Sequence, residues 1–146
     1  MNIEDVIRGN GRYVSTTVGV SMYPMLRNRR DTIVIEPVDE RLKKYDVPLY
    51  RRGEDYVLHR IVKVKPKGYI ICGDNCMRGE YNITDRQIIG VLREFYRDGK
   101  KIDMNGWKYK AYCRIWVAAY PVRYVGKLLI YGVKKVVKTC LKHVVS

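Results

Sequence analysis

The chain has 146 residues, of which 47% are apolar and 30% charged. These proportions are typical of one globular domain, or one domain with an appendage, and argue against a fibrous or membrane-embedded protein. The 29 Lys and Arg against 15 Asp and Glu give a formal charge of +14, which indicates contact with an anionic partner such as nucleic acid or a lipid surface.

The first predicted element is a short helix over residues 2–8, capped by Asn2 and ended by two glycines. From Tyr13 to about Asp103 the sequence consists of short runs rich in β-branched and aromatic residues, which are typical of strands. We expect strands over residues 32–36, 56–64, 68–72 and 88–96, with turns at Pro66-Lys67-Gly68 and Asp98-Gly99. The predicted fold class is mainly β, a small antiparallel barrel or sandwich.

Charge and hydrophobic period both change near Gly106. All 15 acidic residues lie at or before Asp103, and residues 107–146 carry nine basic residues and no acidic ones. We therefore divide the chain into an N-terminal helix with a lead-in strand, a core and a basic helical tail, at residues 1–18, 19–105 and 106–146. No stretch approaches the roughly 18 uncharged apolar residues of a membrane-spanning helix, and the acidic start of the chain does not resemble a signal peptide.

The last helix is predicted to be amphipathic and to begin at Pro121, after a helix or extended aromatic segment over residues 107–120. Lysines lie mostly opposite an apolar face made of Val122, Val125, Leu129, Val133, Val136, Cys140 and Val144. This face, within residues 121–146, has three interpretations. It packs on the β core or on a second copy of the chain, it docks on an anionic membrane surface, or, least favoured, the tail binds nucleic acid. The oligomeric state stays open.

The four cysteines are too few for a disulfide framework in a chain of this length, and they favour a reducing, cytoplasmic setting. Only Gly-Asp-Asn separates Cys72 from Cys76, which is not the spacing of a zinc ribbon, and the sequence has no second such pair. We expect neither a metal site nor a cofactor.

The most informative stretch runs from Gly19 to Leu26, between two strand-like runs. Such a turn can lift the hydroxyl of Ser21 above a sheet edge while the backbone N–H of the same residue points toward the same space. Acyl transfer needs this combination of a nucleophile and an oxyanion donor. A serine in a turn can equally be structural.

A base and an acid are the other requirements of serine catalysis. His59 lies in a strand-like run, and imidazole titrates near neutrality, as a general base must. The second histidine, His143, lies in the basic tail and is expected to face solvent. The box Gly73-Asp74-Asn75, followed by Glu80, supplies acids that can orient a histidine, although Gly-Asp-Asn is also ordinary turn chemistry.

In this order and spacing the three pieces resemble the signal peptidase I and LexA-type clan of serine peptidases, from about Gly19 to Leu92. The matching segments are Ser-Met-Tyr-Pro-Met-Leu at residues 21–26, Arg29-Arg30-Asp31-Thr-Ile-Val-Ile, Tyr45-Asp46-Val47, His59-Arg60-Ile61, Gly73-Asp74-Asn75 and Ile89-Gly90-Val91. A histidine stands where bacterial signal peptidases and LexA-like proteins hold a lysine. The chain therefore looks most like the Ser–His signal peptidases of the endoplasmic reticulum and archaea.

By this resemblance Ser21 is the nucleophile and His59 the general base. Glu80 is the favoured residue to orient the histidine, with Asp74 as a supporting or alternative partner. The oxyanion hole is expected to rest on backbone N–H groups, mainly that of Ser21, beside Gly19, where many signal peptidases carry a serine. Contacts with substrate are expected from Met22, Tyr23 and Pro24.

The implied function is a serine endopeptidase that removes a leader-like segment from a peptide or protein, in the cytoplasm or at the inner face of the membrane. Residues 19–105 are the implied catalytic core. Only 13 residues separate His59 from Gly73, so the large inserted domain of Gram-negative enzymes is not expected. Self-cleavage is not expected either, since no Ala-Gly or Cys-Gly bond precedes Ser21. Two alternatives stay open: a non-catalytic peptide- or partner-binding module of the same fold, and a basic membrane-surface scaffold.

Overall fold

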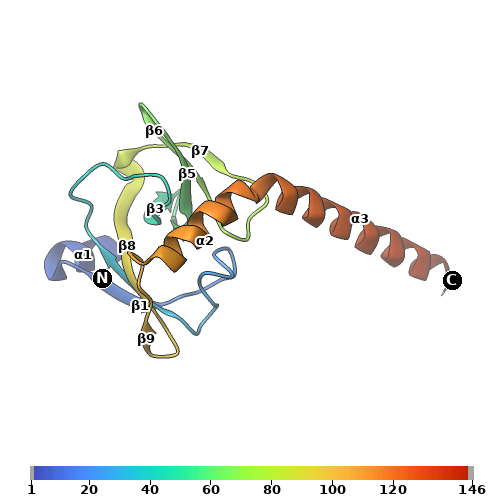
Figure 1. Ribbon diagram of the computed structural model, residues 1–146, viewed down its shortest axis with the longest axis horizontal. Helices are drawn as coiled ribbons and strands as arrows, with labels where there is room; N and C mark the ends of the chain where they lie inside the picture. Colours follow the sequence, from blue (N-terminus) through green and yellow to red (C-terminus); the bar gives the residue numbers. More distant parts are fainter. Residues whose placement is uncertain (1, 145–146) are drawn as a thin grey trace.

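The computed structural model describes residues 2–144, and side chains as far as Leu141. The predicted positions of His143 and Val144 side chains therefore lie outside the described part. Helix α1 (Ile3–Asn10) opens the fold, nine strands follow, and helices α2 (Trp107–Ala118) and α3 (Tyr120–Val144) close it (Figure 1). The strands are β1 (Tyr13–Thr16), β2 (Thr32–Glu36), β3 (Pro48–Arg52), β4 (Asp55–Leu58), β5 (Arg60–Lys65), β6 (Gly68–Cys72), β7 (Glu80–Ile83), β8 (Ile88–Arg97) and β9 (Lys100–Lys101). A 3-10 turn, η1 (Asp85–Gln87), precedes β8.

The strands form two antiparallel sheets. The larger sheet has the order β1-β2-β8-β3-β4, with β9 paired to β8, and the smaller sheet has the order β5-β6-β7. The mainly β class with helices at the C-terminal end is therefore confirmed. Strands β1 and β4 lie at the two ends of the larger sheet's order, so each keeps one edge unpaired within that sheet.

Most predicted elements form close to their expected positions. Asp98 and Gly99 both have positive φ (50° and 76°), as a two-residue hairpin turn between β8 and β9 requires. The run expected as one strand over residues 56–64 is instead two strands, β4 and β5, which belong to different sheets and meet at His59. Strands β3 and β7 were not predicted, because neither run shows a clear hydrophobic alternation.

Two apolar clusters fill the interior of the domain. One lies between α1, the larger sheet and the loop that carries Ser21, and its buried members are Ile7, Met22, Met25, Leu26, Ile33, Ile35, Val47, Leu49, Leu92 and Phe95. The other joins the smaller sheet to β3 and β8, with buried members Leu42, Tyr50, Ile61, Tyr69, Ile71, Ile83 and Val91. His59 lies at the point where the chain passes from β4 of the larger sheet to β5 of the smaller sheet.

The two C-terminal helices relate differently to this domain. Helix α2 packs on it through Tyr109, Tyr112 and the buried Cys113. Helix α3 leaves the domain after about two turns and extends away from it (Figure 1), and every residue from Leu128 to Leu141 is exposed. The interpretation that its apolar face packs on the β core is therefore wrong. Within residues 2–144, no helix combines the length and apolar character needed to cross a membrane.

Candidate active site

Ser21 lies in the loop between β1 and β2, and the residues that follow it in this loop pack into the apolar core. Met22, Met25 and Leu26 point into the core with at most 4% of their surfaces exposed, and the N–H of Leu26 donates to the carbonyl of Met22 at 2.9 Å. The buried carboxylate of Asp31 holds the other end of this loop by accepting from the backbone N–H and guanidinium of Arg27. The loop is therefore held by its buried side chains and by Asp31, while Ser21 itself is partly exposed.

His59 lies opposite this loop, at the break between β4 and β5. Its side chain is buried, with 6% of the residue exposed. The break arises because the chain turns to pair with residues 45–48: the N–H of Ile61 donates to the carbonyl of Asp46 at 2.8 Å, and the N–H of Tyr45 donates to the carbonyl of Ile61 at 2.9 Å. His59 is therefore a corner residue and not part of a strand.

Gly73 shows how close the loop that carries Ser21 comes to His59. A methyl group on Gly73 would lie 2.7 Å from the carbonyl oxygen of Ser21, 2.9 Å from Nε2 of His59 and 2.6 Å from Sγ of Cys76. These three groups therefore surround one small space that only a glycine leaves free. The box also holds the loop directly, because the N–H of Asn75 donates to the carbonyl of Ser21 at 2.7 Å.

A tyrosine links His59 to Glu80. The hydroxyl of Tyr50 lies 3.2 Å from Nδ1 of His59 and donates to Oε1 of Glu80 at 2.7 Å. The direct separation of Nδ1 and Oε1 is 3.7 Å, too long for a hydrogen bond. Because the single hydroxyl proton of Tyr50 is donated to Glu80, its oxygen is left to accept a hydrogen bond from the N–H at Nδ1. This assigns the Nδ1–H tautomer to His59 and leaves Nε2 as the basic nitrogen.

The pKa shifts of His59 and Tyr50 agree with a neutral imidazole and a tyrosine that keeps its proton. Burial lowers the pKa of His59 below its usual 6.5, and the charge of Glu80 partly opposes this effect. His59 is therefore neutral at pH 7 and able to accept a proton. Burial, followed by the hydrogen bond to Glu80, raises the pKa of Tyr50 well above its usual range, so Tyr50 remains a donor. Arg52 also pairs with Glu80, at 3.0 Å.

Nε2 of His59 faces Cys76, whose Sγ lies 3.9 Å away. Although Ser21 and His59 line the same groove, no hydrogen bond joins their side chains, both of which the structure describes. Burial raises the pKa of the Cys76 thiol, so this sulfur is a neutral neighbour and not a thiolate.

The backbone N–H groups of Gly19 and Ser21, the expected oxyanion donors, differ in their hydrogen bonding. The N–H of Gly19 donates to Oδ1 of Asn28 at 2.9 Å, so it is not available to a substrate. The N–H of Ser21 has no acceptor among the described residues, and it remains free to bind an oxyanion.

The three expected substrate contacts, Met22, Tyr23 and Pro24, do not all lie in this groove. Met22 lines the groove beside Ser21, although most of its side chain is buried in the core. Tyr23 is exposed, and Pro24 lines a different cavity, next to Trp107 and Tyr109.

Asp74 has a different partner from the one that was expected. Its carboxylate accepts two hydrogen bonds of 2.8 Å from Arg60 and a third from the hydroxyl of Tyr112. Arg60 is fully buried, and although burial alone lowers the pKa of its guanidinium, the carboxylate of Asp74 raises that pKa above its usual range. The backbone carbonyl of Asp74 accepts from Trp116 and Arg123. Asp74 thus joins the sheet to the C-terminal helices, and the structure does not place it in contact with His59.

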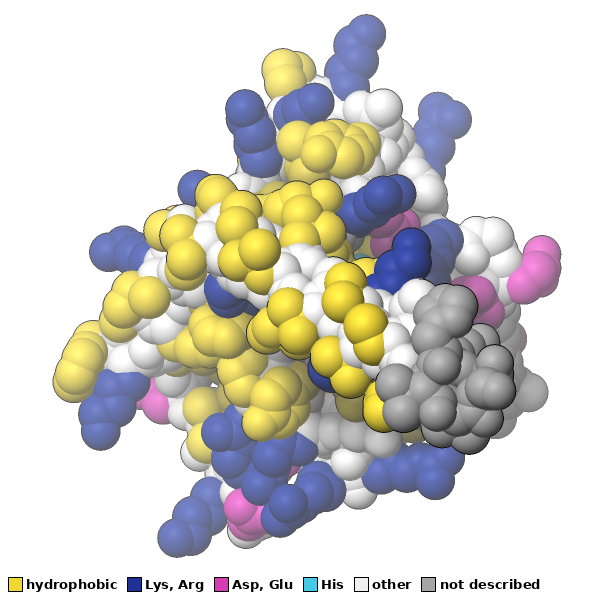
Figure 2. Space-filling view, turned by 90° about the vertical axis from the view of Figure 1, so that its right-hand side faces the viewer, with side chains coloured by type: hydrophobic (Ala, Val, Ile, Leu, Met, Phe, Trp, Pro, Cys, Tyr) yellow, Lys and Arg dark blue, Asp and Glu magenta, His cyan; other side chains and the backbone are white. Residues whose placement is uncertain are grey.

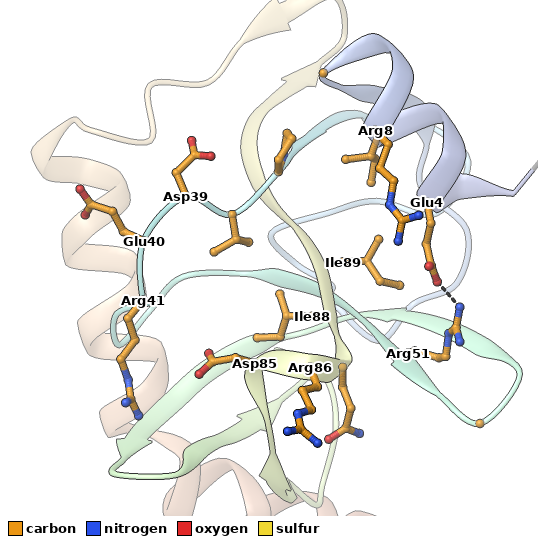
Figure 3. A pocket seen from close by; sticks show the side chains of 16 residues that line it. Glu4, Arg8, Asp39, Glu40, Arg41, Arg51, Asp85, Arg86, Ile88 and Ile89 are labelled. Atoms are coloured by element: carbon orange, nitrogen blue, oxygen red, sulfur yellow. Dashed lines mark hydrogen bonds and ion pairs between the residues drawn. The ribbon is translucent and has the colours of Figure 1, made fainter.

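The groove that holds Ser21 and His59 has a volume of about 460 Å³. Strand β1 lines one side, and strand β4 lines the other with Tyr56, Val57 and Leu58. A larger cavity, of about 1040 Å³, lies elsewhere, between α1, the segment after β2 and η1 (Figure 3). Its side chains carry charges of both signs, among them the ion pair of Glu4 with Arg51, and its lining includes no serine, cysteine or histidine. The smaller groove is therefore the candidate active site.

Tyr50 and Cys76 are the neighbours of His59 that the sequence motifs missed. Tyr50 belongs to a short strand without a motif, and only the packing of the two sheets brings it to the histidine. The spacing from Cys72 bears on Cys76 only as a metal ligand, but the turn formed by the Gly73-Asp74-Asn75 box gives a usable signal. The N–H of Cys76 donates to the carbonyl of Gly73 at 2.9 Å, and this turn places the thiol beside that glycine.

Within the described residues, no three His, Cys, Asp or Glu side chains gather as they do around a metal ion. No protein-family model and no curated protein matches this chain.

Proposed function

We propose that this protein is a serine endopeptidase of the signal-peptidase-like, Ser–His type, in which Ser21 is the nucleophile and His59 the general base. The observation that carries this proposal is the hydrogen-bonded series from Glu80 through Tyr50 to Nδ1 of a buried, neutral His59, beside the loop of Ser21. Such a series orients an imidazole and leaves Nε2 to accept a proton.

The reaction follows the usual course of acyl transfer. Oγ of Ser21 attacks the peptide carbonyl carbon, and its proton passes to Nε2 of His59. The backbone N–H of Ser21 donates to the oxyanion of the tetrahedral intermediate. The intermediate then expels the amine, which takes the proton from Nε2, and a water molecule that His59 deprotonates hydrolyses the acyl-enzyme.

This chemistry requires the side chain of Ser21 to turn toward Nε2 when substrate is bound. Hydrogen bonds of catalytic groups are often absent in the free enzyme and form in the complex with substrate. The hydroxyl belongs to a partly exposed residue in a turn, and rotation about the single Cα–Cβ bond changes its direction.

The groove fits an extended peptide. Its two sides are β1 and β4, the two ends of the strand order of the larger sheet, and each offers unpaired backbone groups to an added strand. A peptide bound in this way passes Ser21 and His59 with its backbone held at fixed register. The resemblance implies small side chains next to the cleaved bond, and a leader segment of a peptide or protein as the substrate.

A second candidate is a peptide-binding module without catalysis. The observation that favours it is the contact of Nε2 with Cys76 in place of Ser21. Both functions use the same groove, but they differ in what happens to the peptide.

The test compares the wild type with Ser21→Ala, His59→Ala and the control Thr139→Ala on a mixed peptide library, with products identified by mass spectrometry. Thr139 is exposed on α3, outside the groove, so this control is expected to leave turnover unchanged. We expect Ser21→Ala and His59→Ala to lower cleavage by about a thousandfold or more. Equal cleavage by all four proteins refutes the mechanism. Peptide retention by the wild type without cleavage identifies the binding module.

A further inference from the structure

Helix α3 is attached to the domain only at its start. Tyr120 donates to the carbonyl of Met77, Arg123 to that of Asp74, and Lys127 to Asn75. From Leu128 onward the described side chains are all exposed. A helix of this composition that packs on nothing exposes apolar surface at a free-energy cost, which indicates that something outside the domain covers it.

The side chains of α3 separate into two arcs. With about 100° of rotation per residue, all the Val, Leu, Ile and Cys side chains described in the helix except that of Leu128 fall within an arc of about 160°. Its members are Val122, Val125, Leu129, Ile130, Val133, Val136, Val137, Cys140 and Leu141. Its described valines, leucines and isoleucine are between 50% and 76% exposed. The other side of the helix carries Lys127, Lys134, Lys135 and Lys138.

The orientation of the two arcs follows from Lys127. This lysine belongs to the basic arc, and it is bonded to Oδ1 of Asn75 at 2.7 Å, so the basic arc faces the domain where the helix begins. The centre of the apolar arc therefore does not face the domain, and Val122 and Val125 at the start of the helix are 76% and 54% exposed. Figure 2, viewed from the side to which α3 extends, shows hydrophobic side chains gathered over the middle of this face and Lys and Arg toward its edges.

We propose that α3 binds the surface of an anionic lipid bilayer, with its apolar arc in the interface and its lysines at the headgroups. The charge of the C-terminal helices favours an anionic bilayer, because residues 107–146 carry nine basic residues and no acidic ones. Clusters of lysine and arginine beside an apolar helix face are attracted to acidic lipids, and the apolar side chains insert at the headgroup boundary.

A second copy of the chain fits this surface less well. Paired helices are usually stabilised by oppositely charged residues that flank the apolar seam, whereas two copies of α3 bring only lysines together. A nucleic acid would bind the lysines and leave the apolar arc uncovered. The lipid surface alone satisfies both arcs, and the inference does not depend on the proposed peptidase activity.

The test is flotation of the full chain with phosphatidylcholine vesicles, with and without phosphatidylglycerol. We expect the wild type and Ser21→Ala to float with the anionic vesicles alike, and binding to weaken at high salt. Leu129→Glu/Val136→Glu places two acids in the apolar arc, and we expect it to lose binding by about tenfold or more relative to the control. The control, Tyr131→Glu/Thr139→Glu, introduces the same charge on the other side of the same helix.

Three results overturn the proposal. The first is failure of the wild type to bind anionic vesicles. The second is an equal loss of binding in the two double variants, which would show that only charge matters. The third is self-association in sedimentation that Leu129→Glu/Val136→Glu abolishes, together with no flotation, which identifies a second copy as the occupant. Leu129→Gln/Val136→Gln replaces the acidic pair if circular dichroism shows that it has lost helix.

Discussion

The roles of the two acids near His59 can be separated by their effect on stability. Asp74 accepts three hydrogen bonds of 2.8 Å, and its main partner, Arg60, is fully buried. Asp74→Ala therefore leaves a buried guanidinium without a counter-charge, which costs about 3–5 kcal/mol. Domains of this size are stable by about 5–15 kcal/mol, so the loss is a large part of the total.

Urea unfolding followed by circular dichroism measures this loss. We expect Arg60→Met/Asp74→Leu, which removes both charges, to recover most of the stability of the wild type. Glu80→Gln is the comparison, because the Glu80 side chain is 25% exposed and its partner Arg52 is mostly exposed. This variant should unfold within about 1 kcal/mol of the wild type. If Asp74→Ala unfolds within about 0.5 kcal/mol of the wild type, the structural role of Asp74 is refuted.

Three further predictions concern the groove. Burial lowers the pKa of His59 and Glu80 opposes this, so Glu80→Gln should move the acidic limb of the kcat/KM profile to lower pH and reduce kcat. Because the folded pKa of His59 lies below 6.5, the unfolded chain binds a proton that the folded chain does not. The free energy of unfolding should therefore fall as pH drops below about 6.5, and less so in His59→Gln. Gly73→Ala should cost about 1–3 kcal/mol and reduce kcat, because its methyl group meets the Ser21 carbonyl at 2.7 Å.

Each of these has a result that contradicts it. A shift of the acidic limb to higher pH in Glu80→Gln excludes a direct electrostatic effect of that carboxylate on His59. An identical pH dependence of unfolding in the wild type and His59→Gln assigns the acid sensitivity to other groups. For Gly73, the matched control is Gly79→Ala, whose nearest contact would be 3.3 Å. Equal activity of the two glycine variants shows that the space at Gly73 is not needed for catalysis.

Local patterns in the sequence predicted the elements whose structure is determined locally. The Asp98-Gly99 turn and the amphipathic period of α3 are examples, since each follows from residues close together in the chain. The break at His59 was not predictable in this way. Residues 56–64 look like one continuous strand, but β4 pairs with β3 and β5 pairs with β6, and Ile61 bonds to residues 45 and 46 where they divide. Long-range pairing of this kind leaves no local signal.

The site illustrates the same limit. The motifs placed Ser21 and His59 in one groove, but they did not indicate that a tyrosine from β3 stands between the histidine and Glu80. The offset in sequence identified the acid that is nearer to His59, whereas the contact itself depends on how the two sheets pack. Asp74 was ambiguous because an acid in a turn gives no sign of its partner, and here that partner is the residue after the histidine.

His59 and Arg60 are adjacent in the chain, but their side chains contact different parts of the domain. His59 lines the groove, while Arg60 binds Asp74. The residue after Asp74, Asn75, donates to the carbonyl of Ser21 and accepts from Lys127 of α3. The Ser21 loop and the start of α3 are therefore both hydrogen-bonded to the segment Asp74-Asn75. The carboxylate of Asp74 in this segment is in turn held by the buried guanidinium of Arg60 at 2.8 Å. The placement of the helix and the geometry of the groove are thus not independent properties of this fold.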